Sequence, residues 1–120
     1  MKGYLFLEYP ACSTCRKAKK WLDEQKVNYT DRHIVEECPT CDELKIWFER
    51  SGLPLRKFFN TSGLLYKSMQ LKEKLDGMSE EKQLELLASD GKLVKRPLVI
   101  GEDFVLVGFK PEEWKTVLLK

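Results

Sequence analysis

Two cysteines separated by two residues, Cys12 and Cys15, lie where the sequence favours reactive thiols. An apolar run at residues 4–7 precedes them and predicts a buried strand, and residues 13–25 have the apolar spacing of a helix. A helix start presents free N–H groups and the positive end of its dipole, and both favour a thiolate. Arg16 adds a neighbouring cation. We therefore predict a redox site in which Cys12, nearer the exposed loop, attacks and Cys15 resolves the mixed disulfide.

A second pair with the same spacing, Cys38 and Cys41, leaves three interpretations open. Two CxxC pairs can form a tetrahedral zinc site, and the second pair can also be another thiol switch. Alternatively, both cysteines are incidental, since Pro39 and Thr40 already explain a helix start there. The chain carries enough apolar residues to form a core without metal, so we predict no metal site. The single histidine, His33, is expected on a solvated strand face rather than as a general base.

Composition limits the classes of function. The chain has 120 residues, of which 42% are hydrophobic and 33% are charged, and we expect one domain over residues 1–120. Its formal net charge of +2 is too small to predict direct nucleic-acid binding. No apolar run is long enough to span a membrane, and no secretory signal is recognised at the N-terminus. We therefore expect a cytoplasmic protein, in which paired cysteines indicate redox or metal chemistry rather than structural disulfides.

The order of predicted elements is strand, helix, strand, a block of helices, two strands and a helix. A Thr-x-x-Glu pattern at Thr40 predicts a helix from Cys41, and Gly52 is placed to end it. Within the block, residues 64–75 are expected to be helical, with Leu64, Leu65, Met69 and Leu71 as core candidates. Residues 97–100 and 104–107 predict a hairpin. This is an α/β order of thioredoxin-like type, with a mixed sheet of about four strands and a helical insertion.

Several motifs carry a family resemblance that extends over nearly the whole chain. They are Tyr-Pro-Ala-Cys-Ser-Thr-Cys-Arg-Lys-Ala at 9–18, Pro-Thr-Cys-Asp-Glu-Leu at 39–44, Lys-Phe-Phe-Asn-Thr-Ser-Gly at 57–63, Lys-Arg-Pro-Leu-Val-Ile at 95–100 and Gly-Phe-Lys-Pro at 108–111. Together these stretches resemble the arsenate reductase/Spx family of thioredoxin-fold proteins. A lone CxxC is common, whereas CxxC-Arg-Lys combined with a distant Lys-Arg-Pro is much more specific.

The reductase branch of that family implies a pocket around Cys12. Its members hold an oxyanion with three arginines, one of which matches Arg96, while Asn60 and Lys110 stand at the other two positions. Lysine offers a point charge and asparagine no charge, so we expect weaker binding of arsenate. The resemblance also implies a cis Pro97 against the active cysteine. It implies no bound cofactor, with glutathione, thioredoxin or glutaredoxin as reductant.

The Spx branch implies a regulator instead of an enzyme. Its members carry a CxxC disulfide switch and bind the RNA polymerase α subunit, and Gly52 resembles a glycine near their polymerase-contact surface. Ending a helix explains the same glycine more simply. The sequence thus leaves open a thiol oxidoreductase and a redox-sensing regulator, and it names neither substrate nor electron donor.

Overall fold

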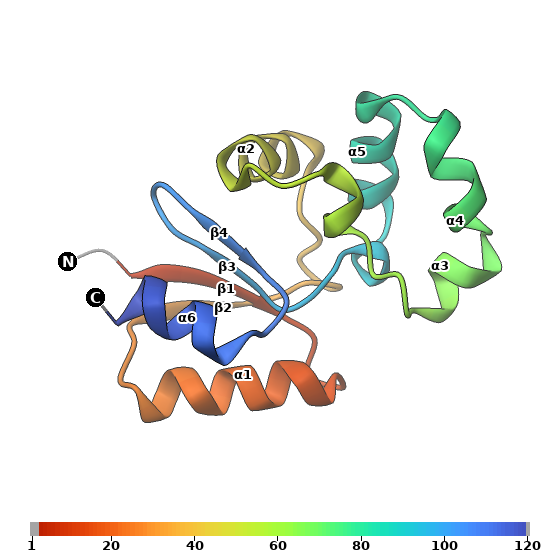
Figure 1. Ribbon diagram of the computed structural model, residues 1–120. Helices are drawn as coiled ribbons and strands as arrows, with labels where there is room; N and C mark the ends of the chain where they lie inside the picture. Colours follow the sequence, from red (N-terminus) through yellow and green to blue (C-terminus); the bar gives the residue numbers. More distant parts are fainter. Residues whose placement is uncertain (1–2, 120) are drawn as a thin grey trace.

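A mixed four-stranded sheet forms the centre of the fold in the computed structural model, which describes residues 3–119 (Figure 1). The strand order is β2-β1-β3-β4, and the strands are β1 (Tyr4–Glu8), β2 (Tyr29–His33), β3 (Leu98–Ile100) and β4 (Val105–Val107). β1 pairs with β2 in parallel and with β3 antiparallel, and β3 pairs antiparallel with β4. The predicted α/β class and thioredoxin-like order are confirmed.

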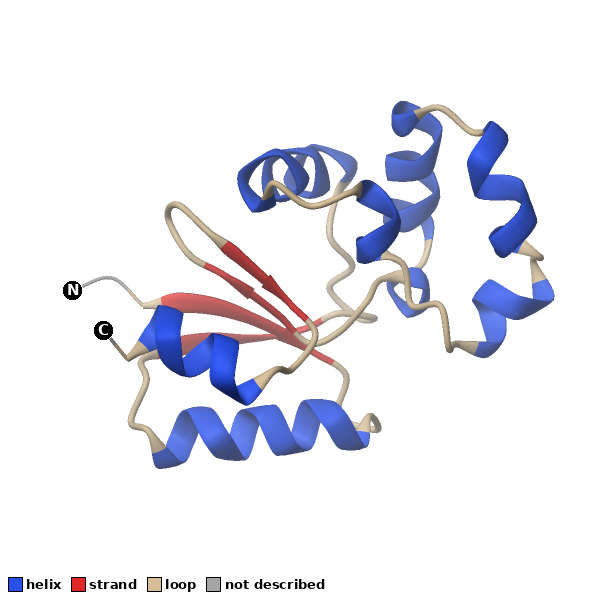
Figure 2. Ribbon diagram, in the orientation of Figure 1, coloured by secondary structure: helices blue, strands red, loops and turns tan. Residues whose placement is uncertain are grey.

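Helices cover both faces of the sheet (Figure 2). α1 (Ser13–Glu24) and α6 (Pro111–Leu118) lie together on one face. The insertion between β2 and β3 lies across the other face and beyond the end of the sheet. It contains α2 (Cys41–Ser51), α3 (Leu64–Ser68), α4 (Leu71–Lys74), α5 (Glu80–Ser89) and the 3-10 turns η1 (Leu55–Phe58), η2 (Leu75–Gly77) and η3 (Gly91–Leu93).

Alternating strand residues divide the buried side chains between two cores. Phe6 and its antiparallel partner Val99 point toward α1 and α6, where they meet the fully buried Trp114. The next pair, Leu7 and Leu98, points toward the helical insertion. Side chains from α2 and α5 complete this second core, which fixes the insertion against the end of the sheet.

The start and end of α2 follow the sequence prediction. The Thr40 hydroxyl accepts a hydrogen bond from the Glu43 backbone N–H at 3.1 Å, and the Glu43 carboxylate accepts one from the Thr40 N–H at 3.0 Å. These reciprocal bonds form a capping box. Gly52 ends the helix in the left-handed conformation, with φ of 69°, which glycine adopts at little cost.

The prediction of one helix over residues 64–75 is wrong. Gln70 has a φ of 55° and separates α3 from α4. Tyr66 and Leu71 are both buried, and their five-residue separation would place them on different sides of a straight helix. The break allows both to face one core. Leu64 was a core candidate, but its side chain is 86% exposed because it stands at the first turn of α3, outside that core.

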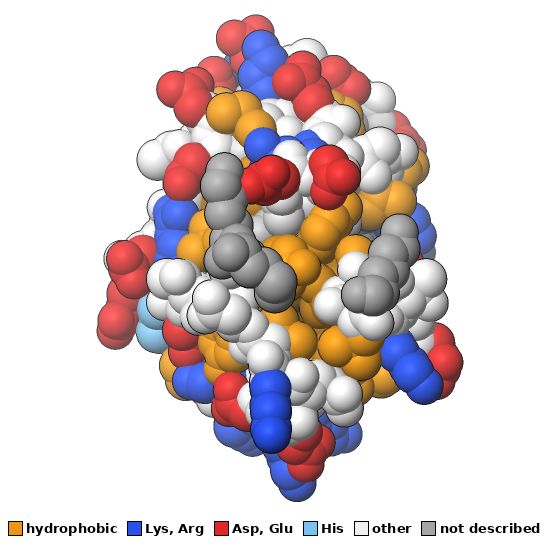
Figure 3. All heavy atoms as spheres, turned by 90° about the vertical axis from the view of Figure 1, so that its left-hand side faces the viewer, with side chains coloured by type: hydrophobic (Ala, Val, Ile, Leu, Met, Phe, Trp, Pro, Cys, Tyr) orange, Lys and Arg blue, Asp and Glu red, His pale blue; other side chains and the backbone are white. Residues whose placement is uncertain are grey.

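Apolar side chains gather in a band on the face near the chain termini, with charged groups on either side (Figure 3). Tyr4, Phe104 and Leu118 are half-buried and pack against the core between the sheet and α1 and α6. Within residues 3–119, no helix is long and apolar enough to cross a membrane.

Candidate redox site

The first cysteine pair lies where β1 turns into α1, as predicted. The loop closes in a turn in which the Cys12 N–H donates to the Tyr9 carbonyl at 2.9 Å. Cys12 is the N-cap residue of α1. Arg16 turns back from the first turn of the helix, and its Nη1 donates to the Pro10 carbonyl at 2.9 Å. The structure therefore places Arg16 as a brace of the loop.

The environment of Cys12 favours its thiolate. Partial burial acts against the charge, but the backbone N–H and thiol of Cys15 and the guanidinium of Arg96 outweigh it and hold the pKa of Cys12 below its usual range. The first turn of α1 contains no acidic residue, so no carboxylate neutralises the positive end of the helix dipole. Cys12 is half-buried and lines an open cleft, which leaves its sulfur accessible.

Cys15 is buried one turn further along α1. Its sulfur accepts a hydrogen bond from the Tyr9 N–H at 3.5 Å. Burial raises its pKa to about 12, and the neighbouring Cys12 adds to the increase. The pair is therefore asymmetric: an accessible sulfur that ionises readily lies beside a buried thiol that keeps its proton.

Arg96 reaches this site from the other end of the chain. The Arg96–Pro97 peptide bond is cis, as the resemblance implies, and Pro97 directly precedes β3. The Arg96 guanidinium stacks over the Tyr9 ring at 4.9 Å, and its Nη1 donates to the Lys92 carbonyl at 3.3 Å. Its Nε is buried and has no hydrogen-bond partner among residues 3–119. The Arg96 side chain is thus held beside Cys12.

A cleft of about 1370 Å³ opens in front of Cys12 and Arg96. It also contains Asn60 and Lys110, so the structure brings together the two positions at which the chain departs from the reductase pattern. The Asn60 side chain is engaged locally, since its Nδ2 donates to the Lys92 carbonyl at 3.4 Å and its Oδ1 accepts from the Ser62 hydroxyl at 3.3 Å.

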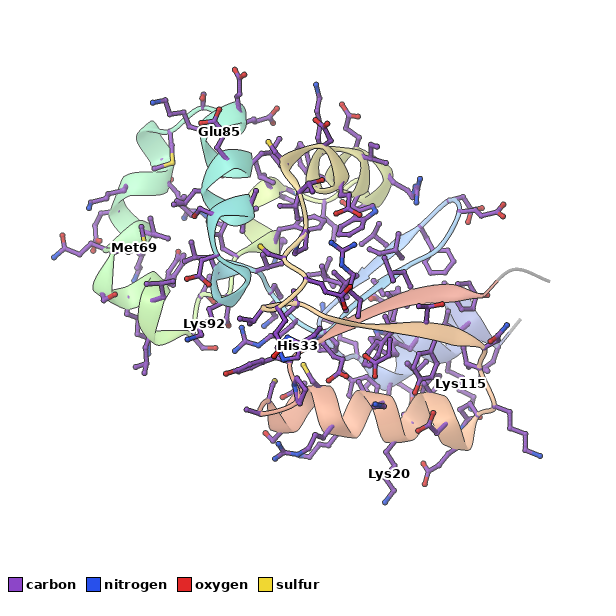
Figure 4. All side chains as sticks on the ribbon, turned by 180° about the vertical axis from the view of Figure 1, so that it is seen from behind. Lys20, His33, Met69, Glu85, Lys92 and Lys115 are labelled. Atoms are coloured by element: carbon purple, nitrogen blue, oxygen red, sulfur yellow. The ribbon has the colours of Figure 1, made fainter. Side chains whose placement is uncertain are left out.

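Sequence reasoning missed three further lysines of the cleft, Lys57, Lys92 and Lys95. Two of them stand inside the resemblance motifs at 57–63 and 95–100, but lysine on a surface is ordinary, and nothing local marks these as neighbours of Cys12. Figure 4 shows Lys92 where the helical insertion approaches the sheet, and this junction forms part of the cleft wall.

Comparison with known proteins decides the family. The model of the ArsC family matches residues 7–117. The chain belongs to the ArsC family. The uncharacterized protein YusI of Bacillus subtilis is 56% identical, covering 92% of this chain and 93% of its own. A crystal structure from Bacteroides fragilis, described as ArsC family related, is 63% identical with a TM-score of 0.93 and covers 96% of this chain and 97% of its own.

Both branches of the ArsC family are represented among more distant relatives. The regulatory protein MgsR of Bacillus subtilis is 31% identical over 90% of this chain and 84% of its own length. Global transcriptional regulator Spx 2 of Bacillus anthracis is 27% identical over 90% of this chain and 81% of its own. The structure of arsenate reductase from Vibrio cholerae is 25% identical, with a TM-score of 0.86, and covers 97% of this chain and 98% of its own.

The second cysteine pair of this ArsC chain lies apart from the cleft. The Cys38 thiol donates to the Ala88 carbonyl of α5 at 3.4 Å, and Cys41 is the first residue of α2. Burial raises the pKa of Cys38, and the negative charge of Asp90 raises it further. Across residues 3–119, no cluster of three or more histidine, cysteine or acidic side chains has the arrangement of a metal site. The four cysteines therefore do not converge on a zinc site.

Two other ionisable groups lie near the loop of the first pair. His33 is half-buried at the end of β2, where its Nδ1 accepts hydrogen bonds from the N–H groups of Val35 at 3.2 Å and Glu36 at 3.0 Å. It therefore stabilises a turn instead of facing solvent freely. Glu8 is buried at the end of β1, and burial together with Asp31 raises its pKa to about 7. Nothing in the sequence marks Glu8, because its burial depends on strand pairing and on α1.

Proposed function

We propose that this ArsC-family chain is a thiol–disulfide redox protein, with Cys12 as nucleophile and Cys15 as resolving thiol. The observation that carries the proposal is the asymmetry of the pair. Cys12 lines the cleft with a lowered pKa, and Cys15 lies behind it, buried and protonated. Only the thiolate attacks a disulfide, so this arrangement selects which cysteine reacts first.

The proposed reaction moves two electrons from the pair to a substrate disulfide. The Cys12 thiolate attacks one substrate sulfur, forms a mixed disulfide and expels the other sulfur as a thiolate, which takes a proton from water. Cys15 then loses its proton to solvent and attacks the Cys12 sulfur. This forms the Cys12–Cys15 disulfide and expels the second substrate thiolate. A dithiol or two molecules of glutathione return the two electrons in the reverse sequence of exchanges.

The high pKa of Cys15 suits this order of events. Part of it comes from the negative charge on Cys12, which disappears once Cys12 enters the mixed disulfide. The pKa of Cys15 therefore falls at the step where its thiolate is needed. Before that step a protonated Cys15 stabilises the Cys12 thiolate by hydrogen bonding.

The remaining predicted site residues have supporting roles in this proposal. Arg96 stabilises the Cys12 thiolate and the departing sulfur, and Arg16 fixes the loop. Pro97, expected in the pocket, does not line the cleft; it connects Arg96 to β3. Asn60 is neutral and bonded to its own surroundings. Of the three oxyanion-binding arginines that the resemblance implies, this chain keeps Arg96 alone. We therefore expect arsenate to be a poorer oxidant than a disulfide. Glutathione, thioredoxin or glutaredoxin is the proposed donor, which fits the reducing cytoplasm.

Mass spectrometry of stalled intermediates tests the proposal. The reduced Cys15→Ser protein, exposed to a small mixed disulfide, is expected to keep one substrate thiol bound to Cys12. Under the same conditions the unchanged protein should lose two hydrogens and form the internal disulfide. Cys41→Ser is the matched control and should behave as the unchanged protein. Reaction of the Cys12→Ser variant at an undiminished rate would refute the assignment.

A second candidate function is a redox-sensing regulator, and it is favoured by the relatives named MgsR and Spx. In this proposal the Cys12–Cys15 disulfide changes the binding of the RNA polymerase α subunit. Gly52 lends it no weight, because its left-handed conformation at the end of α2 is accounted for as a helix cap. Capture of purified α subunit that changes on adding dithiothreitol, and that Cys12→Ser makes insensitive to dithiothreitol, would favour the regulator over the enzyme.

A further inference from the structure

The cleft in front of Cys12 concentrates positive charge. Among residues 3–119, only two carboxylates line it, from Asp90 and Glu113. By contrast, the formal net charge of the whole chain is +2. Six cationic side chains line the cleft: Arg56, Lys57, Lys92, Lys95, Arg96 and Lys110.

Most of these cations are not neutralised by the protein. Arg56 pairs with Asp76 at 2.8 Å. Within residues 3–119, no ion pair involves the four lysines of the cleft. Positive charge concentrated in a concave surface raises the local concentration of anions and speeds their association. The cleft is therefore built to attract a negatively charged molecule to Cys12.

An apolar rim accompanies the positive charge. Leu64 is 86% exposed and Leu53 is 37% exposed, and both line the same cleft. Leu64 extends from the first turn of α3, so it contributes little to the core of its own chain. Together the two leucines add exposed apolar surface to the cleft that contains the reactive thiol, as a site for a polypeptide requires.

We infer that the cleft binds an acidic polypeptide segment whose cysteine is held in a disulfide, with its carboxylates facing the lysines and an apolar side chain on Leu64 and Leu53. The inference rests on the proposed function and names its substrate class. A volume of about 1370 Å³ is far larger than an oxyanion needs. Charge alone would also suit a nucleic acid, but the site offers a thiol, and its natural reaction partner is a sulfur atom.

The reaction at this site is the exchange already described, with the polypeptide cysteine as the attacked sulfur. The Cys12 thiolate bonds to the polypeptide sulfur, and the group formerly attached to that sulfur leaves as a thiolate. Cys15 then releases the polypeptide as its free thiol and leaves the Cys12–Cys15 disulfide. The substrate disulfide is the oxidant, so no other co-reactant is required.

Three probes with the same chromogenic leaving group test the inference. Two are short peptides of equal length with one cysteine and one leucine, in which the other residues are either glutamates or lysines. Each cysteine carries a 2-thiopyridyl group, whose uncharged thione is released on attack and measured by absorbance. The third probe is 2-hydroxyethyl 2-pyridyl disulfide, which is small and neutral. The full chain is used, reduced and freed of excess reductant.

The acidic peptide is expected to react at least about tenfold faster than the basic peptide at low ionic strength, and the difference should shrink as salt is added. Replacing Lys57, Lys92 and Lys110 by glutamine should remove most of the preference. Lys20→Gln is the matched control because Lys20 projects from α1 away from the helical insertion (Figure 4) and does not line the cleft. Equal rates for the two peptides would overturn the inference.

The apolar contact is tested separately. Leu64→Ala should slow the acidic peptide by a factor on the order of five to ten, and by more than it slows the neutral probe. Ile46→Ala is the control, since Ile46 is 51% exposed but lies outside the cleft. A Leu64→Ala variant that reacts with the acidic peptide at the unaltered rate would overturn the apolar part of the inference.

The neutral probe separates the two levels of proposal. If it reacts at Cys12 while the peptides show no preference, the redox function stands and the substrate class is wrong. If none of the probes reacts at Cys12, the proposed function itself fails. Because all three probes release the same group, differences between them report on binding and not on the leaving thiol.

Discussion

The two CxxC pairs have the same spacing and both precede a helix, yet their helix ends are occupied differently. At α2, Thr40 and Glu43 cap each other's backbone, and Asp42 and Glu43 place negative charge in the first turn. At α1 the first turn contains no acid, and the N-cap residue is Cys12 itself. The positive end of α2 is thus already compensated, whereas that of α1 remains available to a thiolate.

Residues from distant parts of the chain increase the difference between the two cysteine pairs. Arg96, brought in from the segment before β3, lowers the pKa of Cys12, whereas burial and Asp90 raise that of Cys38. Arg32 also lies near Cys38, but its guanidinium is held by the Glu43 carboxylate at 2.8 Å and contributes less. Spacing and a helix start are therefore insufficient to predict a reactive cysteine. Burial, hydrogen bonds at the helix start and charges from elsewhere in the fold together set the pKa of each cysteine.

The largest expected difference between the pairs is in alkylation rate. With limiting iodoacetamide at pH 7, Cys12 should be modified about 10–100-fold faster than Cys38, because the rate follows the thiolate fraction. Peptide mapping by mass spectrometry after short exposure gives both rates in one sample. Denatured protein supplies the control, since the difference should then disappear. Equal rates in the folded protein would remove the distinction between the two pairs.

Replacing Arg96 should make the alkylation rate of Cys12 more similar to that of Cys38. Loss of the adjacent positive charge raises the pKa of Cys12, so Arg96→Gln is expected to alkylate about tenfold more slowly at pH 7 and to reach the unchanged rate at high pH. A full pH profile of the rate measures this shift. Arg96→Lys keeps the charge and should lie between the two. A profile that does not move in Arg96→Gln would mean that the helix end alone activates Cys12.

Local signals in the sequence were sufficient for much of the fold. The capping box at Thr40, the glycine end of α2 and the β3–β4 hairpin each depend on neighbouring residues, and each is present. The break at Gln70 was missed because no glycine or proline marks it. It follows from the need to bury Tyr66 and Leu71 together.

The site was less predictable, since its parts come from distant segments. The strand-to-helix corner at Cys12 was predicted from the local sequence pattern. The position of Arg96 at the site was predicted from the family resemblance. The side chain of Arg16 was expected at the thiolate, but its Nη1 donates to the loop carbonyl of Pro10. The lysines of the cleft and the burial of Glu8 depend on how the insertion and α1 pack, which no local pattern encodes.

A smaller effect is expected at α2, in acid stability. The Arg32 guanidinium holds the pKa of Glu43 at about 2, below its ordinary value of about 4.3. The unfolded chain therefore binds more protons between these values, and the stability contributed by ionised Glu43 is lost as the pH falls from about 4.5 toward 2. Urea unfolding at pH 6 and pH 3 should show a smaller drop for Glu43→Gln than for the unchanged protein.

The control for this measurement is Thr40→Ala, which removes the cap hydroxyl but keeps the Glu43 charge. It should lower the free energy of unfolding by about 1 kcal/mol at pH 6. Neither variant should alter the alkylation rate of Cys12, since α2 lies in the helical insertion and not at α1. An undiminished acid-induced loss in Glu43→Gln would show that the ion pair with Arg32 does not contribute to folding stability.

The smallest expected effect concerns Asp90, the charged neighbour that most raises the pKa of Cys38. Asp90→Asn removes the charge, while an asparagine oxygen can still accept the hydrogen bond from the Lys92 N–H that Asp90 Oδ1 now accepts at 2.9 Å. Alkylation of Cys38 should then rise about two- to threefold at pH 8, with burial still limiting it. Asp42→Asn is the matched control. If Cys38 does not respond, burial alone keeps the second pair unreactive.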